Sequence, residues 1–496
     1  MTRTDEAGES TGPATGSPRR SSWRYIGPGI VVAATGVGAG DLVATLIAGS
    51  RFGYTLLWAA VIGCLVKISL AEAAGRWHLA TGQTLFEGWR SLGAWTTVYF
   101  AGYVVVWGFV YGATAMSSSA LPLAALFPDF LGLKTWAVIT GLIGLAFVWF
   151  NHYAVFEKAM TVLVGVMFVV VVYVALRVGP DVPAAVAGLV PALPDGSLLY
   201  TLGLIGGVGG TITMAAYGYW VNAKGWTGPG WIRVMRLDNR VAYVTTGVFV
   251  IAMLITGAEL LHSANIALAS GDRGLLALGE VLEARFGATT ATLFLVGFFA
   301  TSFSSLIGVW HGVSLLFTDF VDRVRSDRAA ARAAAPADPA GSVEPAEPLE
   351  PAEPLDPAEP LDPLGPVRSG TPVRPATPAT PAGTPAAAGA AAPDPVVAEL
   401  ATGAAEKSLP FRAYLLWLTF PPISLLFLDQ PFGLVVLYGV LGAFFMPFLA
   451  LTLLWLLNSD RTPREWRNGP LSNVMLAAAG LLFVVLCVQQ VRELPW

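Results

Sequence analysis

Residues 27–49 read Gly27-Pro-Gly-Ile-Val-Val-Ala-Ala-Thr-Gly-Val-Gly-Ala-Gly-Asp41-Leu-Val-Ala-Thr-Leu-Ile-Ala-Gly49, and residues 202–220 read Leu202-Gly-Leu-Ile-Gly-Gly-Val-Gly-Gly-Thr-Ile-Thr-Met214-Ala-Ala-Tyr-Gly-Tyr-Trp220. Both stretches are apolar, and both carry a glycine cluster at the centre. Glycine costs roughly 1 kcal/mol relative to alanine in a helix interior, so each pattern predicts a helix that unwinds in its middle. Unwound backbone at membrane depth survives only where it is buried in protein or lines a cavity. Two broken spans in matching halves are typical of the binding site of a secondary transporter.

The composition is that of a membrane protein. Hydrophobic residues make up 55% of the chain and charged residues 12%, with a mean hydropathy of +0.63. The two cysteines, Cys64 and Cys487, lie in apolar runs and do not have metal-binding spacing. The sequence contains no P-loop, catalytic triad or metalloprotease motif, so we expect no enzyme activity, no cofactor and no nucleic-acid partner.

Apolar runs predict an all-α polytopic protein with about eleven membrane-spanning helices. We expect them at residues 26–50, 54–76, 94–120, 134–151, 157–178, 198–221, 240–262, 289–320, 412–428, 432–457 and 471–491. Of the 29 Lys and Arg residues, 22 then fall on the side of the N-terminus, six fall on the other side, and Lys67 lies within a span. The excess of positive charge on the cytoplasmic side of membrane proteins places the N-terminus inside the cell, in a multi-pass protein of the plasma membrane.

The chain divides by composition into four parts. Residues 1–22 are polar and predict a disordered cytoplasmic tail, and residues 23–326 hold the first eight spans. Residues 327–408 contain Glu-Pro and Ala-Pro repeats that bury too little apolar surface to fold, so we expect a disordered cytoplasmic loop. That loop is either an inert linker or a docking segment for a partner. Residues 409–496 hold the last three spans.

Motifs along the whole chain make it similar to the natural resistance-associated macrophage protein (Nramp) family of divalent-metal transporters. The first span follows the pattern GPG…DPGN…AG…G…LLW, with Gly27-Pro28-Gly29, Gly38-Ala39-Gly40-Asp41, Ala48-Gly49, Gly53 and Leu56-Leu57-Trp58. Further matches are Arg76 with Thr81-Gly82, Phe156-Glu157-Lys158, Ser304-Ser305 with Gly308, Met446-Pro447-Phe448 and Asn458-Ser459-Asp460-Arg461.

The resemblance implies the fold in which spans 1–5 and 6–10 form an inverted repeat, with the first and sixth helices broken at the substrate site. The chain departs from the family at the metal ligands that this resemblance would supply. Gly38 stands at the aspartate of DPGN, and Asp41 stands at its asparagine. The sixth-span motif M-P-H-N is replaced by Met214-Ala215-Ala216-Tyr217, and Phe303 stands at the eighth-span glutamine.

The candidate substrate site comprises Asp41, Gly38, Gly40, Met214 and Thr211, with Asp41 and Met214 as the proposed metal ligands. A carboxylate near the bilayer centre costs at least about 2.5 kcal/mol and needs a partner, so Asp41 either binds the transported cation or forms a fixed ion pair. The thioether of Met214 is a soft ligand that suits late transition metals, although a methionine in a span can also serve only for packing.

Three further residues are candidates for the pathway or for coupling. Lys67 lies near the middle of the second span and either pairs with Asp41, reaches towards the interface or faces a wet cavity. His311 in the eighth span is either a proton relay or a packing residue. Tyr217 either lines the pathway or anchors a helix end at the membrane interface.

The leading functional hypothesis is uptake of a divalent transition metal, Mn²⁺ or Fe²⁺, by alternating access. One alternative is Mg²⁺ or a small organic solute on the same fold, and an Asp41–Lys67 contact would favour the organic solute. The other alternative is a membrane sensor or scaffold that docks partners through the Pro-rich loop.

Overall fold

The computed structural model describes residues 27–150, 153–207, 209–262, 272–334, 404–428 and 431–492. Within these ranges the chain is helical and contains no strand. Contacts divide the chain into one unit of residues 1–324 with 393–496 and a second unit of residues 325–392. The second unit is described only at residues 325–334, which form the last turns of a helix. The predicted all-α fold class is confirmed.

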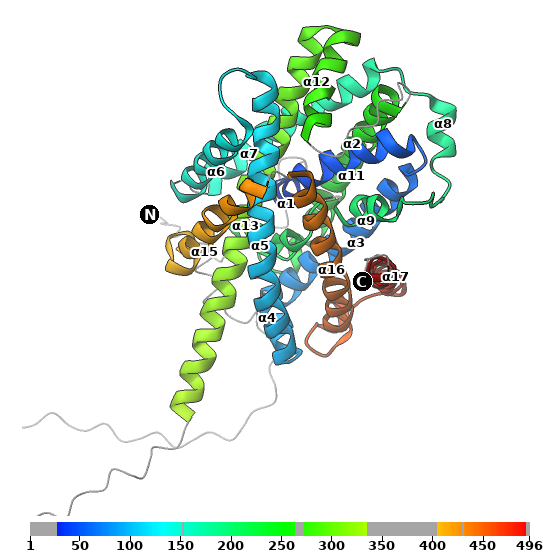
Figure 1. Ribbon diagram of the computed structural model, residues 1–496. Helices are drawn as coiled ribbons and strands as arrows, with labels where there is room; N and C mark the ends of the chain where they lie inside the picture. Colours follow the sequence, from blue (N-terminus) through cyan, green and yellow to red (C-terminus); the bar gives the residue numbers. More distant parts are fainter. Residues whose placement is uncertain are drawn as a thin grey trace, which may run out of the picture. The chain divides into compact units, whose positions relative to one another are not determined.

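The helices follow the predicted spans closely. They are α1 Pro28–Gly36, α2 Ala39–Phe52, α3 Leu57–Thr81, α4 Leu85–Ser91, α5 Ala94–Leu126, α6 Leu133–Phe150, α7 Tyr153–Arg177, α8 Val182–Ala187, α9 Leu198–Gly207, α10 Tyr217–Ala223, α11 Ile232–Gly257, α12 Asp272–Phe286, α13 Ala288–Ala334, α15 Leu409–Thr419, α16 Pro431–Asn458 and α17 Pro470–Arg492 (Figure 1). Short 3-10 or π turns lie at η2 Ile212–Met214, η3 Pro229–Trp231, η4 Ala258–His262, η5 Ala405–Lys407, η6 Pro421–Leu428 and η7 Arg464–Trp466.

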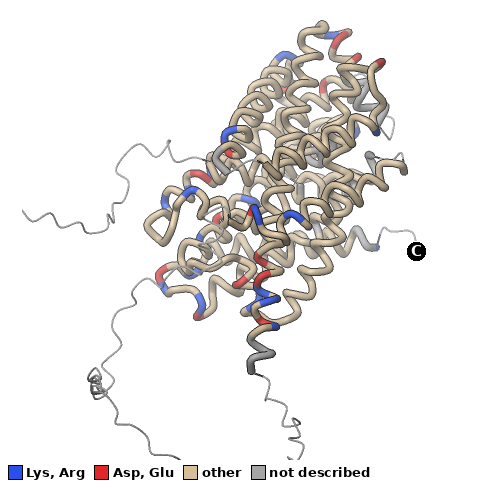
Figure 2. The backbone as a smooth tube through the Cα atoms, turned by 90° about the vertical axis from the view of Figure 1, so that its left-hand side faces the viewer, with Lys and Arg blue, Asp and Glu red and all other residues tan. Residues whose placement is uncertain are grey.

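Nine helices in the described ranges are long and apolar enough to cross a membrane. The pairs α1–α2 and α9–α10 supply the two broken spans. The ninth span continues from α15 into η6, where Pro421 and Pro422 prevent a regular α-helix. Figure 2 shows most of the Lys and Arg residues in the lower half of the view.

Two helices extend furthest beyond their predicted ends. α11 begins at Ile232, although the sequence predicts a span from residue 240, because its first turns carry Arg233, Arg236 and Asp238 and are not apolar. α13 continues to Ala334, so residues 327–334 are helical and not part of a disordered loop. This segment is rich in alanine and arginine, which are strong helix formers. The remainder of the predicted loop up to residue 403, like the tail 1–22, lies outside the described residues.

The broken helices lie at the centre of the first unit. α11 packs against α1, α2, α3 and α7, while α16 packs against α2, α3, α5, α9 and α17 (Figure 1). The broken helices also contact each other, because α1 packs on α10 and α2 packs on α9. α6, α7 and α17 lie further out and expose apolar side chains such as Ile143, Val169 and Leu481. The fold therefore buries the interrupted helices and presents an apolar surface to lipid.

Candidate functional site

The two predicted breaks exist, and they meet. The first interrupts the span at Val37 and Gly38, between α1 and α2. The second follows α9, where Gly209 and Gly210 adopt φ of 73° and 92°, a conformation that glycine tolerates best. A Cβ on Gly36 would lie 1.5 Å from the amide nitrogen of Gly210. The broken ends are therefore packed backbone against backbone.

Lys67 reaches this junction from α3. Its side chain is fully buried, and its Nζ donates hydrogen bonds to the carbonyl of Gly206, at 2.8 Å, and to the carbonyl of Gly210. The last carbonyls of a helix have no partner within it and carry a partial negative charge. The Lys67 ammonium satisfies two of the carbonyls at this break. The sequence predicts Asp41, the membrane interface or a wet cavity as the surroundings of Lys67. It does not predict these backbone carbonyls as its partners.

The sixth-span break also contains buried hydroxyl groups without a hydrogen-bond partner in the described part of the chain. Met214 lies in η2 and is fully buried. Thr211 and Thr213 are at most 3% exposed, and their hydroxyl oxygens have no hydrogen-bond partner in the described part of the chain. A buried polar group without a partner is costly, so a cavity water or a bound substrate would be stabilised beside these hydroxyls.

Gly38, a predicted site residue, is held tightly by α13. A Cβ at this position would lie 1.9 Å from Oγ of Ser305. The Ser305 hydroxyl donates to the carbonyl of Thr35 at 2.8 Å, and Tyr111 from α5 hydrogen-bonds to the same serine. Ser305 therefore satisfies a backbone carbonyl at the end of α1 by a hydrogen bond. The sequence motif around Ser305 does not predict this role.

The predicted metal ligand Asp41 has its backbone in α2, as does Gly40, but the side chain of Asp41 lies outside the described residues. Among the side chains that are described, no group of three or more His, Cys, Asp and Glu could hold a metal ion. The structure therefore leaves Asp41 and Met214 as predicted ligands.

Asp238 was missed by the sequence reasoning. It lies in α11, is 1% exposed, and accepts hydrogen bonds from the backbone N–H groups of Gly27 and Gly29, at 2.9 and 2.5 Å. Tyr217 of α10 donates to the same carboxylate at 3.1 Å. One side chain thus ties the N-terminus of α1 to α10. The predicted pathway residue Tyr217 is fully buried at this junction and does not lie at the lipid interface.

Two further contacts hold α10 at the same end of the bundle. Tyr219 donates to Asp319 of α13 at 2.8 Å, and Lys224 pairs with Glu157 of α7 at 2.6 Å. Arg323, one turn beyond Asp319, pairs with that carboxylate at 2.6 Å. These contacts link α10 to α7 and α13, so this end of α10 cannot move away from them without breaking charged hydrogen bonds.

The opposite end has its own tie, in the turn between α2 and α3. Tyr54 donates to Glu259 at 2.6 Å and accepts from the backbone N–H of Asp181 at 3.0 Å. Burial, together with the hydrogen bond to Glu259, raises the pKa of Tyr54. The phenol therefore stays protonated and keeps its donor role at physiological pH.

His311 is fixed by two polar neighbours. Its Nδ1 accepts from Trp220 Nε1 of α10 at 3.2 Å, and because the indole can only donate, the proton of a neutral His311 lies on Nε2. That Nε2 faces Glu406 at 3.0 Å, and Phe156 stacks on the ring. His311 thus connects α13, α10 and η5. Both sequence readings of this residue, relay and packing, are compatible with these contacts.

The comparisons by sequence agree on one family. The family model described as "Natural resistance-associated macrophage protein-like" matches residues 29–335. A divalent metal cation transporter MntH of Chromohalobacter salexigens is 31% identical over 202 residues, 39% of this chain and 46% of that protein. MntH of Mycobacterium leprae is 26% identical over 336 residues, 62% of this chain and 74% of that protein. A crystal structure of the Eremococcus coleocola manganese transporter aligns with a TM-score of 0.63 at 17% identity, covering 95% of this chain and 88% of that one. At this low identity, the similarity to the manganese transporter structure shows a common fold only.

Proposed function

Because the chain belongs to the natural resistance-associated macrophage protein-like family, whose members are transporters and not enzymes, we propose that it carries divalent metal cations, Mn²⁺ or Fe²⁺, across the cell membrane by alternating access. The observation that carries the proposal is the junction of the two broken helices, with Gly36 packed against Gly210. Freed backbone groups and half-helix ends at such a junction are what secondary transporters use to bind ions.

In this proposal Asp41 supplies the negative charge, and Met214 supplies a soft sulfur ligand. Thr211 adds a hydroxyl oxygen, which is buried and has no partner in the described ranges. The backbone around Gly38 and Gly40 completes the site. A mixed oxygen and sulfur donor set favours Mn²⁺ or Fe²⁺ over Mg²⁺ and Ca²⁺, which prefer oxygen alone. The metal is the transported substrate, and no resident cofactor is part of the proposal.

Alternating access requires that each end of the bundle opens in turn. The contacts of Asp238, Asp319 and Glu157 close the end that we assign to the cytoplasm. The N-terminus lies on that side in our proposal, in a multi-pass protein of the plasma membrane. Release of α10 from these partners would open the inner path, while the tie between Tyr54 and Glu259 holds the outer end.

Lys67 favours a second candidate, a small organic solute. Its ammonium occupies the carbonyls of Gly206 and Gly210 that would otherwise be free for a cation. Two unit charges about 4 Å apart repel each other by about 4 kcal/mol at an effective dielectric constant of 20, and a divalent ion doubles this value. A metal next to Lys67 needs the Asp41 carboxylate to offset that repulsion, whereas the carboxylate of an organic solute would be attracted. Mg²⁺ in a hydrated form, which would not need Met214, is a further alternative.

The test is uptake by purified protein in liposomes under an inside-negative potential. We expect saturable entry of radioactive manganese that Fe²⁺ and Cd²⁺ inhibit more strongly than Mg²⁺ or Ca²⁺. Asp41→Ala should abolish this uptake without lowering the melting temperature, because it removes the charge at the site together with its burial cost. Undiminished uptake by the variant would remove Asp41 from the site. Absence of metal entry, with uptake of amino acids in its place, would favour the organic solute.

A further inference from the structure

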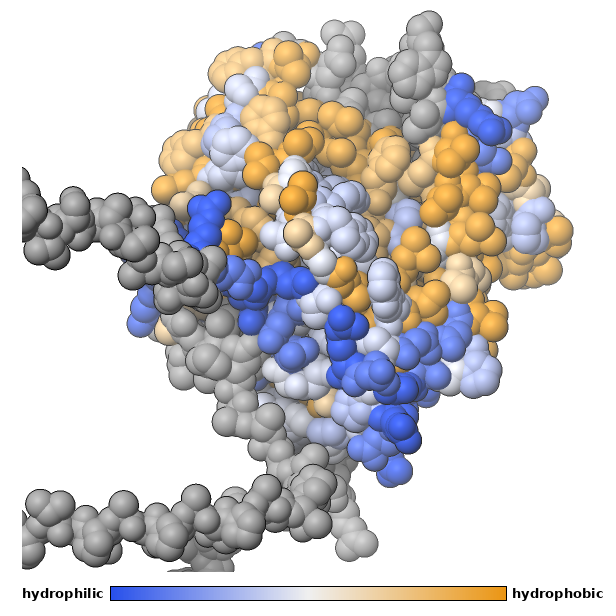
Figure 3. Space-filling view, turned by 90° about the horizontal axis from the view of Figure 1, so that it is seen from below, coloured by the Kyte–Doolittle hydropathy of each residue, from blue (hydrophilic) through white to orange (hydrophobic). Residues whose placement is uncertain are grey.

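A second polar site lies away from the broken helices, at the end assigned to the cytoplasm. A pocket of about 490 Å³ opens between α3, α11 and the segment that leads into α17. Its charged lining residues are Arg76, Arg236, Arg240, Arg467, Glu72 and Glu465. Seen from below, a band of hydrophilic residues crosses this face of the molecule, and hydrophobic residues border it (Figure 3). The pocket thus has a basic lining that also includes the apolar residues Ile68, Leu471 and Met475.

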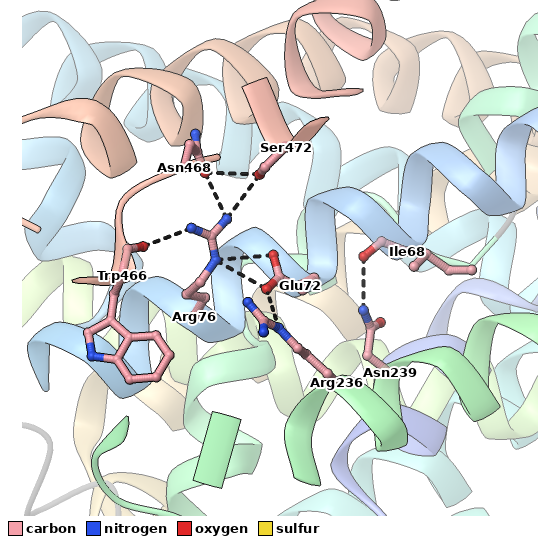
Figure 4. Close-up of polar contacts among 8 residues, drawn as sticks. All are labelled: Ile68, Glu72, Arg76, Arg236, Asn239, Trp466, Asn468 and Ser472. Carbon is pink, nitrogen blue, oxygen red and sulfur yellow. Dashed lines mark hydrogen bonds and ion pairs between the residues drawn. The ribbon is translucent and has the colours of Figure 1, made fainter. Parts of the chain in front are cut away.

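The base of the pocket is a preorganised structure built on Arg76. This side chain is 3% exposed and donates to Glu72, to the carbonyl of Trp466 at 2.8 Å and to Asn468 and Ser472 at 2.7 and 3.0 Å (Figure 4). Arg76 is therefore saturated with partners and fixes α3 to the start of α17. It holds the pocket walls in place and is not itself available to a ligand.

Arg236 and Arg240, one turn apart on α11, carry the charge that remains available. Arg236 uses its Nε for Glu72 at 2.8 Å, so that one carboxylate balances both Arg76 and Arg236. Arg240 is exposed, and its guanidinium group forms no hydrogen bond or ion pair with any residue that the structure describes. Asp460, which does not line the pocket, pairs with Arg467 and neutralises its charge. The three other lining arginines still outnumber the two lining glutamates. An anion is the ligand that this lining stabilises.

Apolar side chains continue from the pocket along the helix surfaces. Val244 and Val248 follow Arg240 at intervals of one helical turn, and they are 58% and 41% exposed. Leu471, which lines the pocket, and Val474 on α17 are 77% and 63% exposed. A soluble anion would gain nothing from these residues, but they suit the acyl chains of a lipid whose head group lies among the arginines.

We propose that this pocket binds the phosphate of an anionic phospholipid in the cytoplasmic leaflet, such as phosphatidylglycerol, with the acyl chains against α11 and α17. Guanidinium groups bind phosphate oxygens through paired hydrogen bonds, and basic pockets between helices on the cytoplasmic side suit lipid head groups. The proposal is independent of the transported substrate, since none of these residues lies at the broken helices.

Native mass spectrometry of the detergent-purified full chain tests the proposal, with phosphatidylglycerol, phosphatidylcholine and inorganic phosphate as separate probes. We expect retention of phosphatidylglycerol over phosphatidylcholine. Arg240→Gln should weaken phosphatidylglycerol binding about fivefold, and the double variant with Arg236→Gln should weaken it further. Arg233→Gln is the matched control, because Arg233 is exposed on the same end of α11, lacks a partner among the described residues and does not line the pocket.

Three results would overturn the assignment. Equal retention of the two lipids would exclude recognition of an anionic head group. Equal losses in Arg240→Gln and Arg233→Gln would mean that the charge of the surface, and not the pocket, attracts the lipid. Competition by inorganic phosphate at the concentration of the lipid would identify a site for a soluble anion. Because lipid retention is measured without transport, failure here would leave the proposed metal transport untouched.

Discussion

Lys67 places a positive charge at the junction of the broken helices. Its ammonium takes the place that a bound cation would occupy beside the carbonyls of Gly206 and Gly210. A buried ammonium is stable only with such partners, so the lysine and the unwound backbone depend on each other. If the substrate is a divalent metal, Lys67 lowers the affinity of the site and so favours release of the metal after transport.

Lys67→Gln should therefore raise the apparent affinity for Mn²⁺ about tenfold, which corresponds to about 1.4 kcal/mol. The glutamine retains N–H donors for the carbonyls but removes the charge that repels the metal. Metal dependence of uptake into proteoliposomes measures the effect. Lys158→Gln on α7, where the lysine is exposed, is the control and should leave the affinity unchanged. Loss of metal uptake in Lys67→Gln would instead show that transport requires the ammonium.

Met214→Ala should change selectivity more than rate. If the sulfur is a ligand, its removal weakens inhibition by Cd²⁺ and relaxes the exclusion of Mg²⁺ and Ca²⁺. The measurement is a panel of competing ions in the Mn²⁺ uptake assay. Met253→Ala in α11 is matched, because that methionine is also fully buried and lies outside the break. Identical inhibition profiles in the parent and Met214→Ala would restrict Met214 to packing.

At the scale of the elements, local sequence predicted the breaks and not their partners. Glycine clusters lower helix stability wherever they occur, so both interruptions could be placed from the sequence. The role of Asp238 could not be predicted from local sequence, because its partners are the backbone amides of Gly27 and Gly29, more than 200 residues away in the chain. The polar first turns of α11 also hid that residue, since they do not resemble a membrane span. The carbonyl partners of Lys67 arise only once α3 packs on α9.

Gly36→Ala should damage the junction of the broken helices. The new Cβ would lie 1.5 Å from the Gly210 amide nitrogen, and backbone cannot move aside as a flexible side chain can. We expect a loss of about 3 kcal/mol or failure to fold, seen as a lower melting temperature and lost uptake. Gly102→Ala in α5 is the control, because nothing lies within 4 Å of its new methyl group. A variant at Gly36 with unchanged melting and transport would contradict the packing of the two breaks.

At the scale of the whole molecule, the long Pro-rich segment and the helix bundle have different physical requirements. The bundle buries apolar side chains on every element that surrounds α1 and α9. Residues 344–362 combine proline with acidic residues, alanine and only three leucines, so we expect them to stay outside such a core. The separation of this segment from the bundle stays a prediction from composition, and composition did not show that α13 continues to Ala334.

Deletion of residues 335–400 should leave transport nearly unchanged. The entropy of closing a flexible loop varies slowly with its length, about 0.6 kcal/mol for each doubling, so the ends can be joined at little cost. Uptake and melting temperature of the deletion protein measure the outcome. A variant in which Gly-Ser repeats of equal length replace the segment separates loss of sequence from loss of length. A folded deletion protein without transport would instead indicate that the loop regulates the bundle.

Transport should depend only weakly on a proton gradient. Proton-coupled transport needs titratable groups along a wet path, but residues 98–116 of the third span contain no Asp, Glu, Lys, Arg or His, and Ala216 stands at the family's sixth-span histidine. His311 remains, with its ring held between Trp220 and Glu406. We therefore expect metal to enter down its electrochemical gradient, to which an inside-negative potential contributes about 4.6 kcal/mol per 100 mV for a doubly charged ion.

Proteoliposomes with a trapped pH dye, a set potassium diffusion potential and metal added outside measure this coupling directly. Metal entry should follow the potential and leave the internal pH nearly constant. His311→Ala should then transport metal with the same small pH change as the parent. Stoichiometric acidification that accompanies metal entry and disappears in His311→Ala would contradict the prediction. His311 would then be the proton relay, and because its Nε2 faces Glu406, the proton would pass towards the segment that follows the long loop.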